Sequence, residues 1–222
     1  MARAVGDGLG TKLGQPVIVE PKLGADASIG TDAVGKAEPD GHAVLMATIA
    51  LAVNPNLSKV PLHPVNDFEG VVHIGFVANV AAVSPSLGVW DLKSFIELAR
   101  AKPGQINYVN PGNGPSPHVS AELLQIVNGI KFSWINYKGM PPAIPDFLTG
   151  TVPFGLFPFG TIAGQTCSGK AQATGIASPV RHKHFPEIPT MAEQGYAGSQ
   201  MNSWCALAAL KKAPRAAIER LS

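Results

Sequence analysis

The sequence predicts an α/β protein built from two lobes. Short runs of β-branched residues alternate with helical patterns along the 222 residues, and this alternation is typical of parallel sheets with helical crossovers. Hydrophobic residues make up 45% of the chain, which is enough for a sizeable core, while 24 glycines and 20 prolines indicate many short elements joined by tight turns. Because both halves contain several strand–helix units, we expect two lobes rather than one.

The first quarter of the chain predicts a helix, a strand, a second helix and a second strand. These lie at residues 2–13, 14–20, 28–37 and 42–48. We expect residues 17–19 and 44–46 to be neighbouring parallel strands. Ligands of such sheets bind beyond the carboxyl ends of the strands, so the second strand's end supplies three candidate contacts, Thr48, Ile49 and Ala50.

The remaining pattern continues the alternation after a loop at residues 54–68. It predicts a strand pair at residues 70–77 and 79–85, a helix at 94–101 capped by Asp91 or Ser94, a strand at 132–139, a short helix at 143–150, strands at 152–158, 170–178 and 201–210, and a closing helix at 214–221.

The most informative stretch is residues 107–125, NYVNPGNGPSPHVSAELLQ, in which a strand ends in a Gly/Pro-rich loop and a helix begins. Pro117 suits a first helical turn, and Ser116 is the expected N-cap. A helix N-terminus favours anions, so a carboxylate could bind here without a cationic side chain. The candidate contacts are Asn110, Gly112, Asn113, Gly114, Pro115 and Ser116. A plain connection is the alternative interpretation, and GNGPSP lacks the third glycine of a dinucleotide-binding loop.

The charge pattern excludes some partners. The net charge is +2, only 14% of residues are charged, and no Lys/Arg cluster is interleaved with aromatic residues, so we expect no nucleic-acid partner. No apolar run approaches the ~20 residues that span a bilayer, and the first residues lack the pattern of a signal peptide. We therefore expect no membrane insertion.

Other reactive residue types form no strong catalytic or metal pattern. Cys167 and Cys205 have no metal-ligand spacing, and their redox state is left open. A hydrolase using Ser116 or Cys205 is the enzyme alternative, but Ser116 and His118 diverge by about 200° on a helical wheel.

Three further motifs have plainer interpretations. GQTCSGKA at residues 164–171 has Ala171 where a phosphate loop needs a hydroxyl, and it precedes a strand, so we read it as a turn. His182 and His184 alternate with basic residues, which oppose a divalent cation. Tyr137 and Lys138 suit either a cleft edge or a plain turn. We predict no metal and no cofactor.

Five phrases, in order, resemble the receptors of the tripartite tricarboxylate transporter systems, called Bug receptors. They are LGQPVIVEPKLGADASIGTDAVGKAEPDGHAVLMAT, NPNLSKVPLHPVNDF, YVNPGNGPSPHVSAELL, NYKGMPPAIPDFLTGTV and FPEIPTMAEQGY. The resemblance implies a two-lobed, type II periplasmic-binding-protein-like α/β fold that closes on a small carboxylate-bearing solute. It also implies a periplasmic location, delivery to membrane transporter subunits, and no catalysis.

The chain departs from this family at several positions. The family usually has a strand and a glycine-rich ligand loop before the first helix of this chain, and further C-terminal helices, so we expect an incomplete first lobe. It usually has GAGG where residues 24–28 read GADAS, which places Ser28 near the site, and an Asp where this chain has Phe157. Phe157 is therefore expected to form a wall of the site.

The resulting prediction assigns residues 1–84 and 205–222 to lobe 1 and residues 85–204 to lobe 2. The predicted function is capture of a small organic acid. The alternative is a degenerate or regulatory relative that has lost solute binding and acts through protein interaction.

Overall fold

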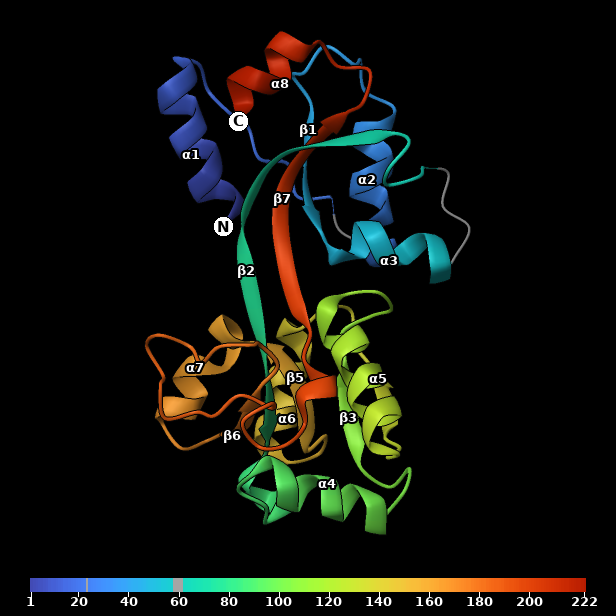
Figure 1. The fold of residues 1–222 in the computed structure, drawn as a ribbon, viewed down its shortest axis with the longest axis vertical. Helices are drawn as coiled ribbons and strands as arrows, with labels where there is room; N and C mark the ends of the chain where they lie inside the picture. Colours follow the sequence, from blue (N-terminus) through green and yellow to red (C-terminus); the bar gives the residue numbers. More distant parts are fainter. Residues whose placement is uncertain (23, 58–61) are drawn as a thin grey trace. The chain divides into compact units, whose positions relative to one another are not determined.

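The computed structural model describes residues 1–22, 24–57 and 62–222, without the side chains of Asp26 and Asn202 (Figure 1). The chain forms two compact units. Unit 1 comprises Met1–Gly75 and Trp204–Ser222, and unit 2 comprises Phe76–Ser203. Residues 58–61 of the predicted loop lie outside the described residues.

Unit 1 contains α1 (Ala2–Leu13), α2 (Ser28–Gly35), β1 (Val44–Thr48), α3 (Ile49–Leu57), the first part of β2 (Phe68–Val83), most of β7 (Asn202–Leu210) and α8 (Arg215–Leu221). β1 pairs antiparallel with β7, with Ala47 opposite Ala206, and β7 lies between β1 and β2 in the strand order. Two small clusters form its core. They contain Ala47, Phe68 and Ala208 in one and Ala209, Ala213 and Ile218 in the other.

The predicted strand at residues 14–20 is wrong, and so is its parallel pairing with residues 44–46. Among the described residues, none pairs with this segment as a strand, and the partner of β1 is the antiparallel β7. The side chains still alternate as in an extended segment. Val17 and Val19 lie against Gly6 of α1, whereas Ile18 is 81% exposed. The β-branched residues thus give residues 14–20 the alternating side chains of a strand, although no described strand pairs with them.

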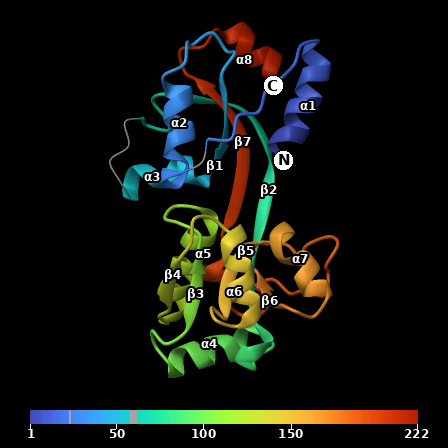
Figure 2. The same ribbon diagram turned by 180° about the vertical axis from the view of Figure 1, so that it is seen from behind.

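Unit 2 is a mixed sheet with helices around it. It adds α4 (Leu92–Ala101), β3 (Asn107–Asn110), α5 (Ser116–Asn128), β4 (Ser133–Asn136), α6 (Ile144–Thr149), β5 (Phe154–Pro158), α7 (Phe159–Cys167) and β6 (Gln172–Ile176). β2 pairs antiparallel with β5 and β6, while β3 runs parallel to β4 and β5. In Figure 2, α6 lies in front of this sheet, and in both ribbon views α4 lies at the end of the unit where β2 ends.

The predicted strand pair at residues 70–77 and 79–85 is one continuous strand, β2. The glycines within it, Gly70 and Gly75, do not adopt the positive φ of a tight turn, so the β-branched run continues unbroken. Two helices were also missed. α3 contains Pro55 and α7 begins with Phe159 and Gly160, a composition that indicates loops and turns.

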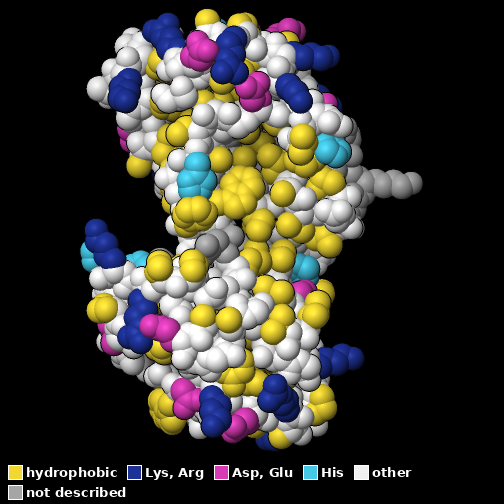
Figure 3. Space-filling view, viewed as in Figure 1, with side chains coloured by type: hydrophobic (Ala, Val, Ile, Leu, Met, Phe, Trp, Pro, Cys, Tyr) yellow, Lys and Arg dark blue, Asp and Glu magenta, His cyan; other side chains and the backbone are white. Residues whose placement is uncertain are grey.

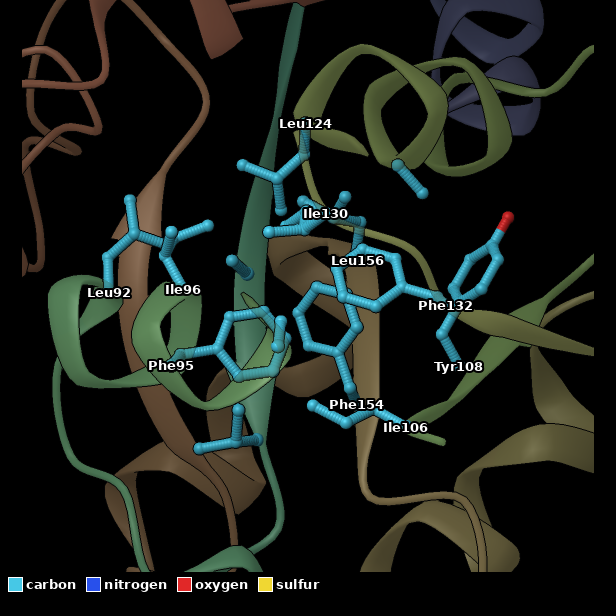
Figure 4. Close-up of a cluster of buried hydrophobic side chains, with 14 of the residues drawn as sticks. Leu92, Phe95, Ile96, Ile106, Tyr108, Leu124, Ile130, Phe132, Phe154 and Leu156 are labelled. Atoms are coloured by element: carbon cyan, nitrogen blue, oxygen red, sulfur yellow. The ribbon is translucent and has the colours of Figure 1, made fainter. Parts of the chain in front are cut away.

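The core of unit 2 is built from aromatic rings (Figure 4). The ring of Phe154 on β5 lies 4.2 Å from that of Phe95 on α4 and 4.8 Å from that of Phe132, measured between centroids. α4 contributes Leu92, Phe95, Ile96 and Ala99, which share one helical face. The Asp91 cap is confirmed, because its Oδ1 accepts a hydrogen bond from the Ser94 N–H at 2.7 Å. This packing holds the sheet of unit 2 in place. The candidate site lies at the end of β3 in this sheet.

Candidate functional site

The candidate site begins where β3 ends and α5 starts. Gly112 and Gly114 have φ angles of 132° and 92°, which side chains with a Cβ rarely adopt. The prediction that Ser116 caps the helix is wrong. Pro115 is the N-cap, Ser116 is the first helical residue, and no side chain caps α5. The fixed φ of Pro115 and its extended ψ start the helix one residue earlier than a Ser116 cap would. The start of α5 therefore has no side-chain cap, and a helix N-terminus of this kind favours an anion.

A buried polar chain lies beside this helix start. Asn79 on β2 donates through Nδ2 to Ser120 Oγ at 3.0 Å, and its Oδ1 accepts from Ser116 Oγ at 3.4 Å. Ser120 Oγ in turn donates to the sulfur of Met201 at 3.5 Å. Asn79 was not predicted as a site residue; it is fully buried on β2, directly before the apolar run VAAV. These hydrogen-bonded side chains place hydroxyl and amide groups in a buried position that apolar side chains would otherwise fill.

Asn110, a predicted contact, is fully buried at the end of β3. Its Nδ2 donates to Asn136 Oδ1 at 2.8 Å, while within the described part of the chain its own Oδ1 has no hydrogen-bond partner. A buried acceptor left unpaired costs about 1–3 kcal/mol. An unpaired oxygen at a strand end, next to a glycine loop, is what a site that receives a ligand or water donor would contain.

His118 supports the loop. Its Nδ1 accepts the N–H of Gly114 at 3.3 Å, and its ring meets Trp134 edge-on at 5.1 Å. The Ser116 hydroxyl is directed instead to Asn79. Because the two side chains bond to different groups, their arrangement does not fit the hydroxyl–imidazole pair of a hydrolase.

The four predicted contacts in unit 1 lie around the start of α2 and α3. Ser28 is the first residue of α2, and its Oγ accepts from Asn54 Nδ2 of α3 at 3.4 Å. Thr48 ends β1, and Ile49 and Ala50 form the first turn of α3. The structure thus groups these residues within unit 1.

Phe157 is fully buried in unit 2. Its ring packs edge-on against Phe147 at 4.7 Å, and a Cβ on Gly155 would stand 2.4 Å from the ring. A small residue at position 155 is therefore required by this ring. The role of Phe157 as a wall of the ligand site stays a prediction.

The side chain of Tyr137 is hydrogen-bonded within unit 2. Its hydroxyl donates to Asp146 Oδ2 of α6 at 2.7 Å. Burial, together with this hydrogen bond, raises the pKa of Tyr137 to about 12. Its neighbour Lys138 is exposed, and Gly139 has the positive φ of a turn.

The other reactive groups do not assemble a catalytic or metal site. Cys167 and Cys205 are free thiols, and burial raises the pKa of Cys205, which lowers its thiolate fraction. In the residues with described positions, no group of three or more His, Cys, Asp or Glu could hold a metal ion. GQTCSGKA forms the C-terminal end of α7 and a turn, so a phosphate would not meet a helix N-terminus there.

The fold defines a class, that of the two-lobed periplasmic binding proteins. It matches a structure of the periplasmic binding protein BugD with a TM-score of 0.89 at 29% identity, over 99% of this chain and 74% of BugD. A second match is an R. palustris protein solved with adipate, with a TM-score of 0.92 at 25% identity over 99% of this chain and 74% of that one. None of the described helices is long and apolar enough to cross a membrane.

The chain belongs to the tripartite tricarboxylate transporter receptor family, TctC, whose model matches residues 1–222. Protein BugT of Bordetella pertussis strain Tohama I is 34% identical over 214 residues, which are 95% of this chain and 66% of BugT. The chain therefore spans just under two thirds of the length of this relative. The predicted family resemblance is confirmed.

Proposed function

We propose that this protein is a receptor that binds a small carboxylate-bearing solute for a tripartite tricarboxylate-type transporter. One observation carries the proposal: the positive-φ loop at Gly112 and Gly114 leads into the uncapped N-terminus of α5, beside the unpaired oxygen of Asn110. Family membership and the likeness to a protein solved with adipate support it.

The backbone supplies most of the attraction for an anion. A helix N-terminus has roughly half a positive charge and oriented N–H groups, and α5 is 13 residues long. Glycine allows a carboxylate to approach these groups closely. The Asn110 oxygen cannot bind the anion itself, but it can accept a hydrogen from a bridging water. No ion pair recorded for the described residues involves the loop at residues 110–116, so no side-chain cation there competes with the backbone for the anion.

In this proposal unit 1 belongs to lobe 1 and unit 2 to lobe 2. The predicted lobes change at residues 84/85 and 204/205, whereas the compact units change at residues 75/76 and 203/204. The proposed solute contacts in unit 2 are the loop residues 110–116, with Phe157 as a wall, and those in unit 1 are Ser28, Thr48, Ile49 and Ala50. A receptor of this kind needs no catalytic group, acts in the periplasm and passes its solute to membrane subunits of the transporter.

Calorimetric titration with mono- and dicarboxylates tests the proposal. Gly114→Val forces a β-branched residue to φ 92° and adds a Cβ beside the anion, so binding should weaken at least about tenfold. Gly129→Val is the matched control, because Gly129 has φ 62° at the opposite end of α5. Both variants should lose stability, but only Gly114→Val should lose affinity.

Two smaller changes separate backbone from side-chain binding. Ser116→Ala removes a hydroxyl near the helix start and should weaken binding a few-fold, whereas Lys138→Ala should leave it unchanged. If the parent binds and only Lys138→Ala abolishes binding, the helix-terminus mechanism is wrong. If the parent binds none of the acids, the alternative of a degenerate or regulatory relative that has lost solute binding is favoured instead.

A further inference from the structure

The three hydrogen bonds beside the start of α5 form a chain in which each donor can be assigned. Ser120 Oγ donates to Met201 Sδ at 3.5 Å, and Asn79 Nδ2 donates to Ser120 Oγ at 3.0 Å. Ser116 Oγ completes the chain by donating to Asn79 Oδ1 at 3.4 Å. Asn79, Ser116 and Ser120 are all buried, so these side chains satisfy one another rather than bulk water.

The sulfur of Met201 fixes the direction of the chain. A thioether accepts a hydrogen bond but has no proton to donate. The proton of the Ser120 hydroxyl is therefore directed to Met201, and the Ser120 oxygen accepts from the next group. The part of the Asn79 amide that faces Ser120 is then the NH₂ group. Its carbonyl oxygen faces Ser116, and because that oxygen only accepts, it takes the proton of the Ser116 hydroxyl.

The Ser116 hydroxyl can therefore offer a solute an acceptor but not a donor. Its single proton is used by Asn79, whereas lone pairs remain on Oγ. A solute carboxylate, which also only accepts, is not stabilised by such an oxygen. A hydroxyl group on the solute can donate to it.

A second acceptor at the start of α5 does not belong to this chain. Asn110 Oδ1 is fully buried at the end of β3 and has no hydrogen-bond partner among the residues that the structure describes. On the face of unit 2 that Figure 3 shows, the Lys and Arg side chains lie away from the start of α5. The site thus combines a helix N-terminus, which suits a carboxylate, with two uncharged acceptors, which suit a proton donor.

A hydroxyl group fits these acceptors better than an ammonium group does. The N-terminal end of a helix has a partial positive charge that opposes a cation. A desolvated ammonium also needs an anionic partner, whereas the two acceptors here are neutral. A hydroxyl on the carbon next to the carboxylate supplies one proton, adds no charge and lies close to the group that the helix binds.

We propose that the solute is a 2-hydroxycarboxylate and that Asn79 sets this preference by directing the Ser116 proton away from the solute. The inference rests on the proposed function, because it assumes that a carboxylate binds at the start of α5. Asn79 is a positioning residue in this scheme, since it acts through the Ser116 hydroxyl.

Calorimetric titration with three compounds that differ only at carbon 2 tests the inference. They are succinate, 2-hydroxysuccinate in either enantiomer, and 2-aminosuccinate. A site that hydrogen-bonds a solute hydroxyl discriminates against the compound that lacks it. One enantiomer of 2-hydroxysuccinate should therefore bind at least about tenfold more tightly than succinate, and 2-aminosuccinate should bind no more tightly than succinate.

Asn79→Leu keeps the size of the side chain and removes both of its hydrogen-bonding groups. The Ser116 proton is then released from Asn79 and can turn to the carboxylate, so the preference for the hydroxyl should fall at least about threefold. Asn128→Leu is the matched control. Asn128 is another buried asparagine with two hydrogen bonds, and it lies at the far end of α5, so this variant should keep the preference within about twofold of the parent.

Met201→Leu keeps the inference testable if Asn79→Leu does not fold. This substitution conserves the volume of the side chain and removes the sulfur that fixes the direction of the chain. The preference for the hydroxyl should fall in the same direction as in Asn79→Leu. Far-UV circular dichroism confirms that each variant is folded before it is titrated.

The quantity compared is the ratio of two affinities, which a general loss of stability does not change. The inference is overturned if the parent binds succinate and 2-hydroxysuccinate equally, or if it binds 2-aminosuccinate most tightly. It is also overturned if Asn79→Leu and Asn128→Leu change the ratio equally, or if folded Met201→Leu leaves the ratio unchanged. If none of the three compounds binds, the inference fails, and the wider titration with mono- and dicarboxylates decides separately whether the proposed function stands.

Discussion

Tyr108 is the largest fully buried side chain of unit 2, and its hydroxyl has no hydrogen-bond partner in the described structure. Burial raises the pKa of this phenol. Tyr108→Phe removes the unpaired hydroxyl and keeps the ring packing on Phe132 and Phe154. We expect a gain of about 1–2 kcal/mol in the free energy of unfolding, measured by urea denaturation.

The matched change is Tyr137→Phe, which deletes a hydroxyl that donates to Asp146 at 2.7 Å. It should cost about 1 kcal/mol. If Tyr108→Phe destabilises the protein as much as Tyr137→Phe does, the Tyr108 hydroxyl has a partner, such as a buried water, that matters to stability.

Ala27 adopts a φ of 72°, in the left-handed region that costs about 1–2 kcal/mol for a residue with a Cβ. Ala27→Gly relieves this cost but increases the freedom of the unfolded chain, so we expect a net gain of about 0.5 kcal/mol. Ala33→Gly, inside α2, should instead lose about 1 kcal/mol. Thermal unfolding of the pair checks the sign, and a loss in both variants would contradict the left-handed assignment.

At the residue level, the sequence predicted the loop at Gly112 and Gly114 but not the buried Asn79 beside it. Gly112 and Gly114 were recognisable because a Gly/Pro-rich run before a helix indicates unusual backbone conformation. Asn79 was missed, because its partners Ser116 and Ser120 lie 37 and 41 positions away and only the folded sheet brings them together. Such long-range polar contacts leave no local pattern.

At the scale of elements, the α4 cap gives a pH-dependent prediction. The Ser94 N–H that Asp91 accepts, followed by the Ser94 hydroxyl, lowers the pKa of Asp91 below its ordinary 3.8. A lowered native pKa adds stability above pH 3.8, and this stability is lost as the pH falls through the native value. Asp91→Ala should therefore cost about 1 kcal/mol at neutral pH and less below pH 3.8.

Asp91→Asn is the control for this cap, because an amide oxygen can accept the same hydrogen bond without titrating. Its stability relative to the parent should be nearly unchanged at neutral pH. A cost for Asp91→Ala that stays constant down to pH 2, measured by denaturant unfolding, would argue against a charged cap.

Elements whose apolar residues recur at helical spacing could be predicted from the sequence. Elements that depend on pairing or packing with another element could not. α4 and α5 follow from helical spacing and their end signals. Residues 14–20 have strand composition, yet a strand needs a partner, and none is present in the described chain. α3 and α7 form despite Pro55 and Gly160 because tertiary packing outweighs weak propensity.

At the scale of the whole molecule, the two units differ in the size of their cores. The clusters of unit 2 contain sixteen and twelve buried hydrophobic residues among those described, whereas the clusters of unit 1 contain three each. Less buried apolar area gives less resistance to local opening. We expect amides of β1 and β7 to exchange with solvent faster than those at residues 80–83 and 108–109, as measured by hydrogen exchange and mass spectrometry. Equal protection of the amides in both units would contradict this expectation and would show that further contacts stabilise unit 1.

Solute binding by the backbone at the start of α5 is the central claim, and nuclear magnetic resonance of the nitrogen-15-labelled chain tests it most directly. Titration with adipate should shift the amide signals of Gly112, Gly114, Ser116 and His118 saturably, since their N–H groups lie in the loop and first helical turn. The Gly129 signal, at the far end of α5, should move far less. Saturable adipate binding that leaves the four signals unmoved would contradict the account.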